Sequence, residues 1–269
     1  MLFPITPAGT KPPFFLVHGL YGLISKRNTA AMARALGTDR TFYAIFARGT
    51  DGIRPPIESV EEMAAEYVKE IRSVQPSGPY YIGGQCAGGL AAIEIARRLS
   101  ESGQQVGVTL LVDPPPLPFG DGGNQLIDIR PQVFQQMYDN AQKVFRRKIA
   151  SMDNAPFDMN DPKRMHAAVV AGIKSAIAFS RFRPAPYSGA TAMIVSTARA
   201  SAYLQPELPW QRILTGPRRI HVLPGDHTEI FNAQLGELCR LMRLILDGVS
   251  VAASNAADAG GEKIAFAAG

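Results

Sequence analysis

The stretch Tyr80-Tyr81-Ile82-Gly83-Gly84-Gln85-Cys86-Ala87-Gly88-Gly89 decides the fold of this chain. It begins as a short apolar strand and passes directly into the alanine-rich helix pattern of Leu90 to Leu99. A strand that turns this abruptly into a helix needs small residues on both sides of the turn, because larger side chains would strike the neighbouring backbone. Glycines stand two positions before and two positions after Cys86. The motif therefore predicts that Cys86 lies exposed on a strained strand-to-helix elbow.

Strand and helix patterns alternate on either side of this elbow. Short apolar runs predict strands at Phe14–Val17, Thr41–Phe46, Tyr80–Gly83, Val106–Val112, Thr191–Ser196 and Arg219–Leu223. Helices are expected at Asn28–Leu36, from Ser59 to about Ile71, at Leu90–Leu99 and from about Thr228 to Leu246. Met1–Pro13 is expected to be an extended lead-in, and Leu208–Leu214 fits neither pattern clearly. Apolar strands separated by helices indicate an α/β fold with a mostly parallel central sheet flanked by helices.

The middle of the chain departs from this alternation. No strand pattern is found from Leu117 to Ser188, and two helices are expected at about Pro131–Ala150 and Pro162–Phe182. We therefore expect one domain over residues 1–250 that carries a helical lid insertion at about residues 117–188. The Ala- and Gly-rich residues 251–269 are expected to form a flexible tail.

Composition excludes several classes of protein. The 269 residues are 46% hydrophobic and 19% charged, which suits one large core. Two cysteines form neither a disulfide framework nor a paired-cysteine zinc motif, and no metal site is expected. No secretory signal, no nucleic-acid motif and no apolar run near the ~18 residues of a membrane span is visible in the sequence. A cytoplasmic enzyme with no nucleic-acid or membrane partner is the expectation, and the formal charge of +5 suits an acidic partner.

Cys86 is expected to be a nucleophile. The helix that follows the elbow presents its positive end to Cys86, and this favours the reactive thiolate. Two other interpretations are open, because a glycine-rich turn can bind phosphate and a cysteine can be an inert core residue. The glycines match neither the G-x-G-x-x-G nor the G-x-x-x-x-G-K pattern, so we favour the nucleophile.

A nucleophilic cysteine needs a base, and His227 is the best placed of the four histidines. It follows the last expected strand, at the carboxyl end of the sheet, where open α/β folds gather their sites. His166 lies in the helical insertion and His221 inside a strand. His18 follows the first strand and should face the same cleft, but it fits better as part of a backbone loop.

Asp113 directly follows an apolar strand and is expected to orient His227. In many enzymes of this architecture the acid instead follows a later strand. That strand is Met193–Ser196 here, and the next carboxylate after it is Glu207. Asp226 is an alternative, although a residue adjacent to the histidine generally points elsewhere.

Acyl chemistry also needs donors for the developing oxyanion. The residue after the nucleophile supplies one backbone N–H, here that of Ala87. The second is expected from the loop His18–Gly22, with Leu20 the first choice and Tyr21 the next.

These motifs resemble the thioesterase domains that release products from polyketide and non-ribosomal peptide assembly lines. The matching pieces are Pro13–Gly19, Tyr80–Gly89, Leu110–Asp113, Pro186–Gly189 and Pro224–His227. The likeness covers roughly residues 1 to 248 and implies an α/β-hydrolase fold. The family's acid falls at the position that Asp113 holds.

The resemblance implies a thioesterase or acyltransferase. Its polyketide or peptide-like acyl group would arrive as a phosphopantetheine thioester on an acyl carrier or peptidyl carrier protein, and no bound cofactor is implied. Most members carry serine where this chain has Cys86, and some carry cysteine. A thioester acyl-enzyme reacts more readily with amines than an ester does, so aminolysis, cyclisation and acyl transfer become candidates beside hydrolysis.

Other functions compete with this interpretation. Dienelactone hydrolases, which cleave carboxylic esters or lactones, also have a cysteine elbow but are usually shorter and lack the helical insertion. Non-catalytic binding proteins of the α/β-hydrolase type usually lose a triad member, whereas this chain keeps all three. Family-like sequence that begins near Met1 suggests a free-standing protein, and an excised synthase module stays open as the alternative.

The insertion is expected to form the acyl pocket; the alternative is that most of its apolar residues only pack it on the sheet. The expected pocket residues are Tyr21, Phe134, Met137, Tyr138, Ile173 and Ile177. The densest basic run, Arg146-Arg147-Lys148, lies in the same insertion, and Arg181 and Arg183 lie near its end. These charges could steer an acidic carrier protein, or they could simply be solvated side chains.

Overall fold

The fold is given by a computed structural model that describes residues 1–20, 22, 24, 26–117, 131–150, 161–204 and 209–252. Seven strands in these residues form one sheet in the order β1-β3-β2-β4-β5-β6-β7. The strands are β1 (Leu2–Pro4), β2 (Lys11–Val17), β3 (Arg40–Ile45), β4 (Tyr80–Gln85), β5 (Val106–Val112), β6 (Thr191–Ser196) and β7 (Arg218–Leu223). Only the edge pair β1–β3 is antiparallel within this sheet. The predicted mostly parallel sheet is therefore confirmed.

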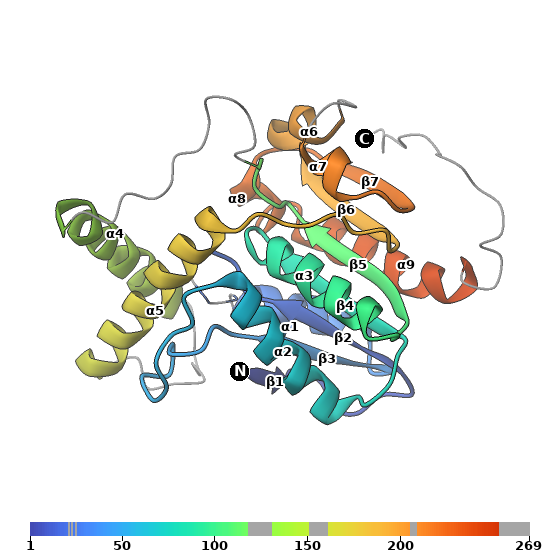
Figure 1. Cartoon of the computed structure of the whole chain (residues 1–269). Coiled ribbons are helices and arrows are strands. Elements are labelled where there is room, and N and C mark those ends of the chain that lie inside the picture. The colour runs from blue at the N-terminus through green and yellow to red at the C-terminus, as the bar shows by residue number, and fades with distance from the viewer. Residues whose placement is uncertain are drawn as a thin grey trace.

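Helices cover both faces of the sheet. They are α1 (Lys26–Leu36), α2 (Val60–Val74), α3 (Gly88–Glu101), α4 (Pro131–Ala150), α5 (Pro162–Arg181), α6 (Thr197–Leu204), α7 (Pro209–Ile213), α8 (His227–Ile230) and α9 (Leu235–Ala252). In Figure 1, α2 and α3 lie in front of the sheet, and α1 and α9 lie behind it. Helices α4 and α5 pack against each other at one side of the sheet (Figure 1), where the sequence predicts an insertion.

The strands are apolar along their length because both faces are buried. In β2, Phe15 and Val17 join the core cluster beneath α2 and α3, while Phe14 and Leu16 join the cluster beneath α1 and α9. Alternate residues of a strand point to opposite faces, so a run of apolar residues serves both layers. This arrangement fixes the carboxyl ends of the parallel strands at one edge, where the loops that carry the candidate residues begin.

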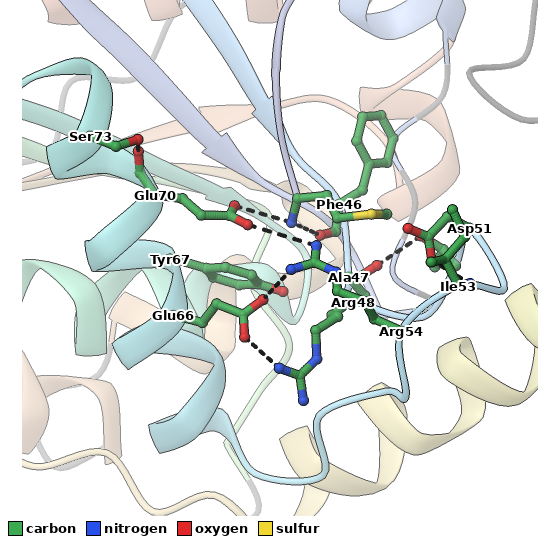
Figure 2. A network of polar contacts seen from close by, with 12 residues as sticks. Phe46, Ala47, Arg48, Asp51, Ile53, Arg54, Glu66, Tyr67, Glu70 and Ser73 are labelled. Atoms are coloured by element: carbon green, nitrogen blue, oxygen red, sulfur yellow. Dashed lines mark hydrogen bonds and ion pairs between the residues drawn. The ribbon is translucent and has the colours of Figure 1, made fainter.

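A polar network ties the turn-rich segment after β3 to α2. An Arg48 Nη1 donates to Glu66 Oε2 at 2.6 Å, and Arg54 pairs with Glu66 and Glu70 at 3.3 and 3.9 Å. Figure 2 shows these side chains converging on one face of α2, next to Tyr67. Each such pair is worth at most ~1 kcal/mol alone, but several in one network hold the segment against the helix.

The structure differs from the sequence expectations mainly at the termini and in one short helix. The expected lead-in Met1–Pro13 supplies β1 and the start of β2, because its prolines sit where the ladder does not need their N–H groups. The expected last helix is two helices, α8 and α9, and the unassigned segment near Leu208 contains α7. The tail expected over residues 251–269 lies outside the described residues beyond Ala252. In the part of the chain described, no helix combines the length and the apolarity that a membrane crossing requires.

Candidate active site

The elbow between β4 and α3 has the strain that its sequence predicts. Cys86 has a φ of +52°, in the left-handed region that residues with a side chain rarely adopt. A Cβ on Gly84 would lie 2.3 Å from the Gly88 oxygen, and a Cβ on Gly88 would lie 2.0 Å from the His18 oxygen. Neither contact is possible, so both glycines are required for the turn.

The Cys86 thiol is held in an environment that favours its charged form. Burial is the largest influence and raises its pKa, but a hydrogen bond with His227, the charge of that ring and the Ala87 N–H together bring the pKa below the ordinary value. The second cysteine, Cys239, is the opposite case, because burial raises its pKa to about 11. Reactivity of a thiol follows its thiolate fraction, so the surroundings of Cys86 favour a reactive thiol more than those of Cys239 do.

Asp113 is fully buried at the end of β5, and its carboxylate reaches two elements beyond its own strand. Its Oδ2 lies 2.6 Å from His227 Nδ1, and its Oδ1 accepts the Ser196 N–H at 2.8 Å. Burial raises the pKa of Asp113, but the hydrogen bonds from His227 and Ser196 outweigh it and lower the pKa below the usual range. The carboxyl group is therefore ionised and fixed in direction.

His227 links the other two residues. Burial lowers its pKa, but the hydrogen bonds to Asp113 and Cys86 and the thiolate charge raise it to about 9. Because Nδ1 is bound to Asp113, Nε2 is the nitrogen left for the sulfur. A lowered thiol pKa beside a raised imidazole pKa favours a thiolate–imidazolium pair at neutral pH.

Asp226, the alternative acid, has a different role. Its Oδ1 accepts the N–H groups of Thr228 and Glu229 at 2.7 and 2.9 Å, and the Asp226 N–H donates to Glu229 Oε2 at 2.8 Å. This capping box starts α8 and turns the Asp226 carboxylate toward the backbone.

The other histidines lie in different surroundings. His166 bonds to the Tyr138 hydroxyl at 2.8 Å, between the two insertion helices, and His221 lies within β7. His18 is fully buried, and burial lowers its pKa to about 4. Its Nδ1 contacts the Gly19 oxygen at 2.8 Å and its Nε2 contacts the Tyr67 hydroxyl at 2.9 Å. A neutral ring donating to Gly19 and accepting from Tyr67 satisfies both contacts and supports the loop after β2.

The two expected oxyanion donors belong to different segments, Ala87 to the elbow after β4 and Leu20 to the loop after β2. The Ala87 N–H bonds to the Cys86 thiolate, so it already points into the site. Leu20 lies in a turn closed by the Gly22 N–H to the Gly19 oxygen at 3.0 Å, and it packs against the same core cluster as Cys86. Tyr21 lies outside the described residues. The roles of Ala87 and Leu20 as oxyanion donors stay predictions.

The expected pocket residues pack mostly toward the α1 and α9 side. Ile173 is fully buried in that cluster, and four others lie partly buried against it: Phe134, Met137, Tyr138 and Ile177. Two aromatic residues near the end of α5, Phe179 and Phe182, instead join the cluster that contains Cys86. Sequence reasoning missed this pair, although two large rings at the end of an insertion helix are a usable signal. Whether any of these residues line an acyl pocket stays a prediction.

The chain is similar to a thioesterase-domain family model and to short parts of large synthetases. The family model described as thioesterase domain matches residues 12–246. Malpinin synthetase of Mortierella alpina is 38% identical over 115 residues, which are 43% of this chain and 2% of that protein. A dimodular nonribosomal peptide synthase of Bacillus subtilis (strain 168) is 35% identical over 113 residues, 42% of this chain and 5% of that protein. The chain thus matches only a small part of the length of these relatives.

Two solved structures have the same fold. The NocB thioesterase domain of the nocardicin cluster has a TM-score of 0.68 at 22% identity, covering 92% of this chain and 99% of that one. The type II thioesterase BorB of the borrelidin cluster has a TM-score of 0.66 at 18% identity, covering 91% and 97%. The shared architecture is a mostly parallel sheet with helices on both faces.

Proposed function

The chain belongs to the thioesterase domain family and has the α/β-hydrolase fold, and we propose that it takes an acyl group from a phosphopantetheine thioester through a covalent Cys86 acyl-enzyme. The observation that carries this proposal is the arrangement at the elbow. A strained cysteine with a lowered thiol pKa adjoins an imidazole that is itself bound to a buried carboxylate. Nucleophile, base and orienting acid in hydrogen-bonded sequence are what acyl transfer requires.

In the first half-reaction the Cys86 thiolate attacks the thioester carbonyl, and a carbon–sulfur bond forms. The carbonyl electrons move onto oxygen, where the N–H groups of Ala87 and Leu20 are the proposed donors. When the intermediate collapses, the bond to the pantetheine sulfur breaks. His227, which starts as imidazolium, gives its proton to the departing thiolate, so the carrier thiol leaves neutral.

In the second half-reaction an acceptor attacks the acyl-enzyme. Neutral His227 takes a proton from the attacking water, alcohol or amine, and the second tetrahedral intermediate expels Cys86 as a thiolate. The starting thiolate–imidazolium pair is then restored. Asp113 stays ionised throughout and stabilises the imidazolium that is present at the start and is restored in the second half-reaction.

A carrier protein is the proposed source of the acyl group. The nonribosomal peptide synthase relative named above supports a carrier protein as the partner, and the net charge of +5 supports an acidic one. Arg146 on α4 and Arg181 on α5 are exposed on the insertion helices, where they are available to such a partner. The shape of the pocket would select the acyl chain, and the second substrate that enters would decide between hydrolysis and transfer to another acceptor.

Intact-mass measurement after incubation with pantetheine thioesters of increasing acyl length tests the proposal. We expect a mass increase equal to the acyl group, located on the peptide that contains Cys86. Cys86→Ala should lose the adduct and the turnover, whereas Cys239→Ser, which changes the buried cysteine, should keep both. Turnover that persists in Cys86→Ala would overturn the proposed mechanism. A matched series of oxygen esters separates this activity from an esterase, because a thioesterase should acylate faster from the thioesters.

A further inference from the structure

Arg199 occupies a place that helix electrostatics disfavour. It lies in the first turn of α6, two residues after that helix begins at Thr197. The first turn of a helix carries partial positive charge, so acidic residues are favoured there and arginine is not. The position also follows β6, where related architectures can place the catalytic acid. A cation at this point needs a compensating partner.

That partner is the Asp113 turn. Arg199 Nη1 lies 3.3 Å from the carboxylate oxygen Oδ2 of Asp113. It also donates to the backbone carbonyl oxygens of Asp113 and Pro114, at 2.7 and 3.2 Å. Asp113 has a φ of +43°, so the turn that Arg199 binds is strained. The carboxylate oxygen that Arg199 approaches is the same one that binds His227.

We propose that Arg199 is a positioning residue that clamps the strained Asp113 turn and shares the Asp113 carboxylate with His227, and so sets the charge balance of the Cys86–His227 pair. This inference rests on the proposed function, because the balance matters only if the pair performs acyl transfer. Arginine suits the task because one planar group can bind a carboxylate and backbone carbonyls together.

The direction of the electrostatic effect is the same at all three residues. Burial and the direct hydrogen bonds act more strongly, but the Arg199 charge lowers the pKa of Cys86, of Asp113 and of His227. At Cys86 this favours the thiolate that attacks. At His227 it opposes the strong hold of Asp113 on the imidazolium proton, and the second half-reaction needs a ring that can release that proton.

The other ionisable groups around the pair are occupied in different ways. Asp226 and Glu229, on the α8 side, are engaged in the capping box. His18, on the β2 side, is buried with its two ring nitrogens bound to Gly19 and Tyr67. Among the described residues, Arg199 is thus the cation that contacts Asp113 in addition to the His227 imidazolium.

Two substitutions separate the charge of Arg199 from its hydrogen bonds. Arg199→Gln keeps a donor for the carbonyl oxygens but removes the charge. Arg199→Lys keeps the charge on a shorter side chain without the planar guanidinium, so it should not reach all three oxygens. Arg240→Gln is the matched control, because Arg240 is an exposed arginine that pairs with Glu237 on α9. The rate of Cys86 alkylation by iodoacetamide is measured from acidic to alkaline pH, with mass spectrometry distinguishing Cys86 from Cys239. The pH profile of kcat/KM for a small acyl thioester is measured on the same variants.

For Arg199→Gln we expect alkylation of Cys86 at pH 6 to fall by about threefold or more, with recovery at higher pH, because removing a nearby cation raises a thiol pKa. Both limbs of the kcat/KM profile should move to higher pH. Arg199→Lys should keep the wild-type pH profile and lose part of kcat, and Arg240→Gln should match the wild type throughout.

Two results would overturn the inference: an unshifted alkylation profile in Arg199→Gln, or a kcat loss in that variant that is the same at every pH. If Arg199→Gln is too unstable to assay, an Arg199→Lys profile that differs from the wild type counts equally against it. Failure of the proposed function looks different. In that case wild-type Cys86 itself would alkylate only near the ordinary thiol pKa, and no acyl adduct would form on it.

Discussion

Asp113 Oδ2 lies 2.6 Å from His227 Nδ1, although 114 positions separate the two residues in the chain. Their strands, β5 and β7, are not neighbours, because β6 lies between them. The left-handed turn at Asp113 directs the carboxylate across the end of β6, where Ser196 also donates to it. An acid after β5 can therefore serve a histidine after β7, and the position after β6 is free for Arg199.

Replacing Cys86 tests its role as the nucleophile. We expect Cys86→Ala to lower turnover by at least ~10³-fold, as removal of a triad nucleophile does elsewhere. Cys86→Ser should keep measurable hydrolysis, because its hydroxyl can occupy the same elbow. The oxygen ester of this variant reacts less readily with amines. The ratio of hydroxamate to free acid formed in the presence of hydroxylamine should therefore fall below that of the wild type. An unchanged product ratio would argue against an acyl group on residue 86.

Replacing Asp113 tests the orienting acid. Loss of the acid from a serine triad costs about 10⁴-fold in kcat, and we expect Asp113→Asn to cost less, about 10- to 10³-fold, because a thiol ionises more easily than a hydroxyl. Asp226→Asn is the matched control, since asparagine is also a good N-cap and α8 should still form. Loss of activity in Asp226→Asn with little effect of Asp113→Asn would reverse the assignment of the acid.

The Asp113–His227 pair should also make stability depend on pH. The pKa of His227 is raised to about 9 from 6.5, so its stabilising contribution is complete below about pH 6.5 and is lost as the pH rises through 9. We expect the difference in melting temperature between the wild type and Asp113→Asn to be larger at pH 6 than at pH 9.5. A difference that stays constant over this range would show that the raised pKa does not depend on Asp113.

The elbow and the order of the elements could be predicted from the sequence because they depend on local patterns. Gly84 and Gly88 reveal the tight turn directly, and the expected bounds of β5, β6 and α4 agree with the structure. The start of β2 was harder to predict. The two prolines at the start of β2 hid the beginning of this interior strand, because a proline ring fixes φ and removes a donor, and the pairing of β2 with β3 is irregular between Lys11 and Phe14.

The contacts of Arg199 could not be predicted at all. In the sequence it is one of four residues after β6 that offer no carboxylate, and only the parallel pairing of β5 with β6 brings it beside Asp113. For Phe179 and Phe182 the two rings were themselves a usable signal, but a helical pattern gives only the apolar face of α5 and not the cluster that this face meets. Local periodicity specifies elements, whereas the partners across the site depend on how those elements pack.

The insertion helices should control the preferred acyl length. Met137→Ala and Ile177→Ala remove partly buried side chains from α4 and α5 without emptying the deep core. If they line the pocket, the preferred thioester should become longer, with a change of about fourfold in relative kcat/KM for each methylene newly accommodated. Val74→Ala, at an exposed site on α2, is the control. Unchanged selectivity in both variants would place the pocket elsewhere.

Salt should distinguish a carrier-bound substrate from a small one. Charge attraction raises association rates and is screened over about 8–10 Å at moderate ionic strength. We therefore expect kcat/KM for an acyl group on an acidic carrier protein to fall as salt rises from about 50 to about 500 mM, while kcat/KM for the pantetheine thioester stays nearly constant.

Arg146→Glu and Arg181→Glu should lower the carrier-bound rate at low salt, because both side chains are exposed on the insertion helices. The side chains of Arg147 and Lys148 lie outside the described part of the chain, so the test is placed on these two. Arg240→Glu, on α9, supplies the same change of charge away from the insertion. Equal salt dependence for both substrates, or equal loss in Arg240→Glu, would mean that net charge alone acts and that the insertion does not receive the carrier.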